Sequence, residues 1–226
     1  MTSIEFVFKN LGASFITTAS KLTKKLNEVE GLIFDWDGVF NSGIKSGEFT
    51  STFSEVDSMG INMLRFAYWL KHKKIPYTAI ISGQNSQTAV EFAKREHFNE
   101  IFCSFKDKKQ TLPIIKNTAK LKAGKLCFVF DDIIDVTVAM KCHVSFLIRR
   151  KSNPLFVEFI KNNKYADYIS ANSGSENALR EISELITGLL GLFDEVLKNR
   201  INFSDTYQNY FEERNKIITK IHIAKF

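Results

Sequence analysis

The feature that most constrains the fold is a regular alternation of short apolar runs and amphipathic segments between residues 31 and 147. Short continuous apolar runs are typical of strands buried on both faces of a parallel sheet. Strands that alternate with helices along a chain form right-handed βαβ units. The sequence therefore predicts an α/β fold, a doubly wound (Rossmann-like) parallel sheet with helices on both faces. The predicted strands are 31–34, 77–81, 100–103, 125–130 and 143–147, and the predicted helices between them are 58–73, 86–97, 107–120 and 133–141.

The flanking segments are less regular. Apolar positions at helical spacing predict one or two helices over residues 4–29, and weak alternation around Gly47 predicts a β-hairpin at 43–54. Two further helices are expected at 175–198 and 204–221. The apolar arc of the first of these suits packing against the sheet or a subunit interface. We expect an N-terminal helical extension (1–30), a catalytic domain (31–198) and a C-terminal helical extension (199–226).

Composition excludes several classes of protein. Hydrophobic residues make up 44% of the 226 residues and charged residues 25%, which is ordinary for a globular domain. Eleven Gly and three Pro are too few for a disordered chain or a turn-dense all-β fold. The net charge of +6 allows phosphorylated small molecules, nucleic acids or acidic membranes as partners.

Cysteine usage and the terminal sequence suggest a cellular setting. Cys103, Cys127 and Cys142 form no close-spaced pair, so buried thiols are expected rather than disulfides or a zinc site. The N-terminus shows no signal-peptide pattern, and no run approaches the roughly 18 apolar residues that span a bilayer. We therefore expect a cytoplasmic protein without a membrane partner.

Carboxylates follow two of the predicted strands. Asp35 and Asp37 come at the end of the first strand, and Asp131 follows the strand at 125–130. In open α/β sheets, ligands bind outside the carboxyl ends of the strands, so these side chains should converge. Carboxylates that lie close together repel one another unless a cation neutralises them, and oxygen ligands favour Mg²⁺. The sequence therefore predicts a magnesium site, with one aspartate free to act as a nucleophile and another to move a proton.

Four segments in order along the chain resemble the motifs of haloacid dehalogenase (HAD) superfamily phosphatases. Residues 34–43 (FDWDGVFNSG) resemble the first motif, DxDGV(x)3G, and Ile80-Ile81-Ser82-Gly83 resembles the second. Asp107-Lys108 resembles the third, a lysine at a helix start, and residues 129–135 (VFDDIID) resemble the fourth, GDDxxD. The resemblance extends from about Gly31 to Arg180.

The resemblance implies catalytic roles. Asp35 would attack phosphorus to form an aspartyl-phosphate, and Asp37 would act as the general acid and base. Ser82 and Lys108 would bind the transferring phosphoryl oxygens. Lys106 and Lys109 flank Lys108 and are expected to be solvated.

The resemblance also implies a metal centre and a substrate pocket. Asp35, the backbone carbonyl of Asp37 and Asp131 would hold Mg²⁺, with Asp132 or Asp135 beside them. Gly83 and Asp57 would join Ser82 and Lys108 in binding the substrate.

The nearest subgroup is similar to the 3-deoxy-manno-octulosonate 8-phosphate phosphatases and the related nonulosonate 9-phosphate phosphatases. Its members lack a cap domain and assemble as homotetramers in which a neighbouring subunit covers the site. The resemblance implies an enzyme of this kind that acts on a small phosphorylated metabolite, a sugar-acid phosphate.

Several positions depart from the family pattern. Phe130 stands where the fourth motif has Gly, Gln84 where the second often has Arg, and Val56 precedes Asp57 where an Arg is common. A changed substrate explains these departures while the catalytic set is kept. Two alternatives remain: an inactive HAD-fold binding or assembly protein, and, disfavoured, a nucleic-acid end phosphatase.

Overall fold

The computed structural model describes residues 3–45 and 51–224. These residues form one eight-stranded sheet, whose strands are β1 (Ser14–Phe15), β2 (Gly31–Asp35), β3 (Tyr77–Ile81), β4 (Glu100–Cys103), β5 (Leu126–Phe130), β6 (Val144–Leu147), β7 (Tyr168–Ile169) and β8 (Lys220–Ile223). Their order in the sheet is β1-β7-β6-β5-β2-β3-β4-β8. Every neighbouring pair is parallel except β1 with β7. The predicted doubly wound parallel sheet is confirmed.

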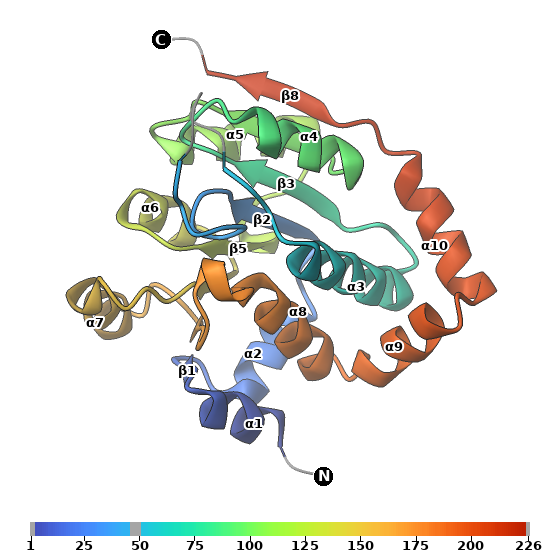
Figure 1. Cartoon of the computed structure of the whole chain (residues 1–226), viewed down its shortest axis with the longest axis horizontal. Coiled ribbons are helices and arrows are strands. Elements are labelled where there is room, and N and C mark those ends of the chain that lie inside the picture. Colours follow the sequence, from blue (N-terminus) through green and yellow to red (C-terminus); the bar gives the residue numbers. More distant parts are fainter. Residues whose placement is uncertain (1–2, 46–50, 225–226) are drawn as a thin grey trace.

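Helices cover both faces of this sheet (Figure 1). Along β5, Cys127 and Val129 pack in one apolar cluster, whereas Leu126, Phe128 and Phe130 pack in the other, because successive side chains of a strand point to opposite faces. The first cluster includes residues of α2 (Ala19–Leu26), α3 (Glu55–His72), α4 (Gln87–Arg95) and α8 (Ala178–Leu189). The second includes residues of α5 (Thr111–Thr118), α6 (Val136–Ala139) and α7 (Pro154–Asn163).

Helix α3 is buried on more than one side. It lies beside α8 on one face of the sheet, in front of the strands in Figure 1, and its outer side is covered by α9 (Phe193–Ile201) and α10 (Asp205–Asn215). Phe66 and Trp69 of α3 pack there with Tyr210 of α10. The Tyr207 hydroxyl donates to Asn62 Oδ1 at 2.9 Å. The C-terminal helices are therefore packed into the fold.

The central strands and helices match the predicted ones closely, but the C-terminal third does not. The helix predicted at 175–198 is two helices, α8 and α9, because the chain bends at Gly191, which has φ = +73°. The helix predicted at 204–221 ends at Asn215 and is followed by the edge strand β8. Helix α7 and the short strands β1 and β7 were not predicted.

The hairpin predicted at 43–54 falls partly outside the described residues, since 46–50 are not among them. Residues 43–45 and 51–54 are not in strands. Apart from 46–50, the described chain runs from β2 to α3 without an inserted cap domain. The N-terminal helix α1 (Ile4–Leu11) and α2 precede β2, as expected. None of the helices in the described ranges is both long and apolar enough to cross a membrane.

Candidate active site

The carboxyl ends of two central strands place carboxylates close together. Asp35 ends β2, and Asp131 directly follows β5, its parallel neighbour. The chain turns outward from β2 to β3 and β4 on one side and to β5, β6 and β7 on the other, which makes this the switch point of the sheet. Asp135, at the end of the 3-10 turn η4 (Ile133–Asp135), completes the group.

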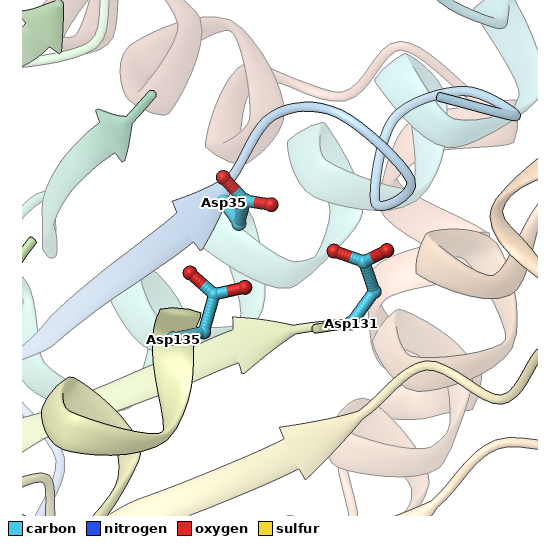
Figure 2. Close-up of side chains that lie close together, drawn as sticks. All are labelled: Asp35, Asp131 and Asp135. Atoms are coloured by element: carbon cyan, nitrogen blue, oxygen red, sulfur yellow. The ribbon is translucent and has the colours of Figure 1, made fainter. Parts of the chain in front are cut away.

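The three carboxylates share one small space (Figure 2). One oxygen from each of Asp35, Asp131 and Asp135 lies within 4.8 Å of the others. All three residues are buried, with 4%, 1% and 0% of their surface exposed. Buried carboxylates this close are costly unless cations accompany them.

Lys108 is the first of those cations. Its Nζ donates to Asp35 Oδ1 and, at 2.6 Å, to Asp135 Oδ1. Burial by itself would lower the pKa of Lys108, but the two carboxylates outweigh it, so the pKa lies above its usual value. Lys106 and Lys109 are exposed, so Lys108 is the lysine of this run that is buried against the carboxylates.

Arg150 is the second cation. It follows β6, and its Nε donates to Asp131 Oδ2 at 2.7 Å while its Nη2 contacts the same oxygen. The other oxygen, Asp131 Oδ1, is buried and has no partner among the described residues. Burial, with Asp35 nearby, raises the pKa of Asp131 to about 8, although Arg150 opposes the shift. Burial and Asp35 likewise raise the pKa of Asp135 to about 7, against Lys108.

The donor set fits a divalent cation of the magnesium type. Asp35, Asp131 and Asp135 offer only oxygen ligands, which hard cations prefer. The unpartnered Asp131 Oδ1 is a buried acceptor without a donor, which a metal ion would satisfy. Burial is the main cause of the raised pKa values of Asp131 and Asp135, and the negative charge of Asp35 adds to it.

Gly38 allows the loop after β2 to pass next to this cluster. Its φ is +85°, and a Cβ there would overlap the Asp131 carboxylate and the Arg150 guanidinium. The glycine of the DxDG pattern is therefore needed for both conformation and space.

Asp37 lies at the rim of the site with its own partners. Its Oδ1 accepts a hydrogen bond from Ser51 Oγ at 2.9 Å, and Lys45 forms an ion pair with Oδ2. Trp36 Nε1 in turn donates to Ser51 Oγ at 2.8 Å. The Asp37 side chain is not one of the three clustered carboxylates.

A cavity of about 490 Å³ opens onto the carboxylates. Residues at the carboxyl ends of five strands, β2 to β6, line it: Asp35, Asp37, Gly43, Gly83, Gln84, Lys106, Lys108, Asp131, Asp132, Ile134 and Arg150. The predicted site residue Ser82 directly follows β3, is fully buried and is not among the residues that line the cavity. Its hydroxyl accepts the Gln84 N–H at 3.1 Å.

Two predicted site residues take other positions. Asp57 lies at the start of α3 and accepts the Arg180 N–H at 2.9 Å, so it caps the first turn of α8 and does not line the cavity. Asp132 is exposed and caps η4 through the Ile133 N–H. It lines the cavity but is outside the three-carboxylate group.

Phe130 does not crowd the site. Its ring is fully buried in the second apolar cluster, on the face of the sheet that α5, α6 and α7 cover, and it stacks on Phe128 with ring centroids 5.7 Å apart. The Gly-to-Phe departure therefore changes the core and leaves the cavity open.

A second cavity, of about 340 Å³, adjoins the first. Arg149, Arg150 and Lys151 line it together with the turn η5 (Gly174–Glu176). Gly174 packs so tightly on the loop after β2 that a Cβ would overlap the carbonyl oxygens of Gly38 and Asn41.

Arg150, Lys45 and Ser51 were not predicted as site residues. Arg150 carried a usable signal, because it follows the strand predicted at 143–147, and ligand sites gather at such ends. Lys45 and Ser51 reach Asp37 from within the predicted hairpin and carry no signal of their own.

Comparison with known proteins places the fold. The chain matches no protein-family model and none of the curated proteins. Among solved structures, it is similar to one described as a HAD superfamily (subfamily III A) hydrolase from Legionella pneumophila, with 20% identity and a TM-score of 0.66 over 81% of this chain and 95% of the other.

Two similar structures are named as phosphatases. The 3-deoxy-D-manno-octulosonate 8-phosphate phosphatase from Moraxella catarrhalis, in complex with magnesium, phosphate and the sugar acid, has 20% identity and a TM-score of 0.65 over 80% of this chain and 98% of its own. The cobalt-bound enzyme from Haemophilus influenzae has 21% identity and a TM-score of 0.62 over 83% and 99%. The strand order, the position of the carboxylates and these similarities together show that the chain has the fold of the HAD superfamily hydrolases.

Proposed function

We propose that this protein is a magnesium-dependent phosphomonoester hydrolase that works through an aspartyl-phosphate on Asp35. The observation that supports this most directly is the buried group at the switch point. Asp35 is held by Lys108, which also binds Asp135, while Asp131 presents an unpartnered oxygen beside them. A nucleophile, a fixed ammonium and an oxygen-only metal site are the parts that phosphoryl transfer needs.

The side chains divide the reaction into two steps. In the first, a carboxylate oxygen of Asp35 attacks phosphorus, the phosphorus–oxygen ester bond breaks, and Asp37 gives its proton to the leaving oxygen. In the second, Asp37 takes a proton from a water molecule that attacks the phosphorus of the aspartyl-phosphate, which frees phosphate and restores Asp35. Ser51 and Lys45 hold the Asp37 carboxyl group in place for both transfers.

Other groups bind the charge that moves through these steps. Lys108 reduces the repulsion between Asp35 and an anionic substrate, and it is too buried to turn away. Ser82 is buried next to Gly83, which lines the cavity, and it would donate its hydroxyl proton to a phosphoryl oxygen once its side chain is uncovered. Asp35, Asp131 and the carbonyl of Asp37 would hold the Mg²⁺, which neutralises phosphoryl oxygens when bound.

For the substrate, we propose a small phosphorylated sugar acid. The Moraxella catarrhalis structure that this chain resembles was solved with a sugar acid and a separate phosphate ion. The adjoining cavity lined by Arg149, Arg150 and Lys151 suits a second anionic group on the same molecule.

A panel of phosphate esters, assayed with Mg²⁺ and with EDTA, tests the proposal. We expect phosphate release that requires Mg²⁺ and that Asp35→Asn abolishes. The matched control is Asp107→Asn, since Asp107 is exposed, caps a turn that Asn also caps, and otherwise makes a long surface ion pair with Lys109 at 4.0 Å. A folded protein that binds Mg²⁺ yet hydrolyses no ester would refute the proposal and favour the inactive HAD-fold alternative.

A further inference from the structure

Arg150 forms an uneven pair with Asp131. Two of its nitrogens are directed at the single oxygen Oδ2, while Oδ1 of the same carboxylate is left without a partner. An arginine that binds a carboxylate in the usual bidentate way contacts both oxygens. One oxygen of Asp131 also lies within 4.8 Å of oxygens of Asp35 and Asp135, so the carboxylate faces the space that the three share.

The local charges show what a divalent cation would change. Three carboxylates face two cations, Lys108 and Arg150. Lys108 is bound to two carboxylates at once, whereas Arg150 is bound to Asp131 alone among the three. A dication on the carboxylates would repel both cations, and Arg150 has fewer contacts to lose.

Arg150 is also the cation whose side chain is free to move. Its side chain is 32% exposed, compared with 1% for Lys108. It lines the reaction cavity and the adjoining basic cavity, so its guanidinium lies at their boundary. A small rotation would direct its planar set of donors to a phosphoryl group in the reaction cavity, which is a better bidentate partner than one oxygen.

We propose that Arg150 and a divalent cation compete for Asp131, and that the cation releases the guanidinium to bind the phosphoryl group of the substrate. This inference rests on the proposed function. It makes Arg150 a substrate-binding residue and couples metal binding to phosphate binding through one side chain. Metal and phosphate then bind in a favoured order, metal first.

Calorimetric titration of the full chain with MgCl₂, and then with inorganic phosphate at saturating Mg²⁺, tests the coupling. In Arg150→Gln the competing charge is gone, so Mg²⁺ should bind about tenfold more tightly. Phosphate should bind at least about tenfold more weakly, because a charge-assisted bidentate contact is lost. The matched control is Arg95→Gln, whose wild-type side chain pairs with Glu55 at the surface and lines neither cavity; both affinities should be unchanged.

Arg150→Lys separates charge from shape and serves also if the Gln variant fails to fold. The lysine keeps the competing charge but not the planar donors, so Mg²⁺ affinity should stay near wild type while phosphate affinity falls. Equal or weaker Mg²⁺ binding by Arg150→Gln, or unchanged phosphate binding by either variant, would overturn the inference about Arg150 alone. Wild-type protein that binds no Mg²⁺, or that binds it equally well as Asp131→Asn, would overturn the proposed function as well.

Discussion

Replacing Asp131 with Asn should stabilise the protein in EDTA, and the gain should grow as the pH rises. Burial raises the pKa of Asp131 from 3.8 to about 8, so between these values the folded protein keeps a proton that the unfolded chain has released. The free energy of unfolding of the wild type then falls by about 1.4 kcal/mol for each pH unit from this group. Because Asn cannot ionise, the free energy of unfolding of Asp131→Asn does not fall with pH in this way.

The size of the effect follows from this slope. From about pH 5 to about pH 7, the wild type should lose about 3 kcal/mol relative to Asp131→Asn. That difference is a large part of the 5–15 kcal/mol typical of a folded domain, so it is readily measured. Urea unfolding in EDTA at several pH values gives the free energy of unfolding of both proteins directly.

The control and the metal complete the test. Asp107→Asn, at an exposed cap, should show no such growth with pH. Saturating Mg²⁺ should raise the stability of the wild type much more than that of Asp131→Asn, because only the wild type offers the full carboxylate set. A difference between Asp131→Asn and the wild type that stays constant or shrinks from pH 5 to pH 7 would refute the reasoning.

Two further substitutions test the surroundings of the site. Gly174→Ala should reduce phosphatase activity and lower the free energy of unfolding, measured in urea, by about 1–3 kcal/mol, because the new Cβ would overlap two carbonyl oxygens of the loop after β2. The control Gly124→Ala places its Cβ in open space and should change neither activity nor stability. Asp57→Asn should stabilise the protein at about pH 8 more than at about pH 5. Burial raises the pKa of Asp57 from 3.8 to about 7, so between these values the unfolded chain releases a proton that the folded wild type keeps, and the wild type loses stability as the pH rises. If Asp57→Asn instead raised KM with unchanged stability at both pH values, Asp57 would be a substrate-binding residue, as the sequence predicts.

The central sheet could be predicted from the sequence because its strands are buried on both faces. Residues 77–81 and 100–103 are continuous apolar runs or nearly so, and the structure has strands at these same residues. Burial selects such runs regardless of the details of packing. The positions of Asp35, Ser82, Lys108 and Asp131 after successive predicted strands then indicated which strand ends form the site.

The C-terminal strand could not be predicted in the same way. Ile221 and Ile223 of β8 are 42% and 58% exposed, so no buried run marks the strand. It exists because it pairs with β4, a contact that local periodicity does not encode. Arg150 differs, because its place after a predicted strand was a usable signal; only its pairing with Asp131 of another loop could not be predicted.

Each of the two edge strands, β1 and β8, pairs with a strand that lies far from it in the sequence. Strand β1 pairs with β7, and the adjoining Thr17 hydroxyl bonds to Asp167, 150 residues later in the chain. At the other edge, β8 closes on β4, and the Thr219 hydroxyl bonds to the carbonyl of Ala93, 126 residues earlier. During synthesis on a ribosome, β1 therefore waits for β7, and the edge of β4 stays open until β8 has emerged. Such an open edge can pair with other chains, so the edge of β4 is exposed to strand addition until β8 is in place.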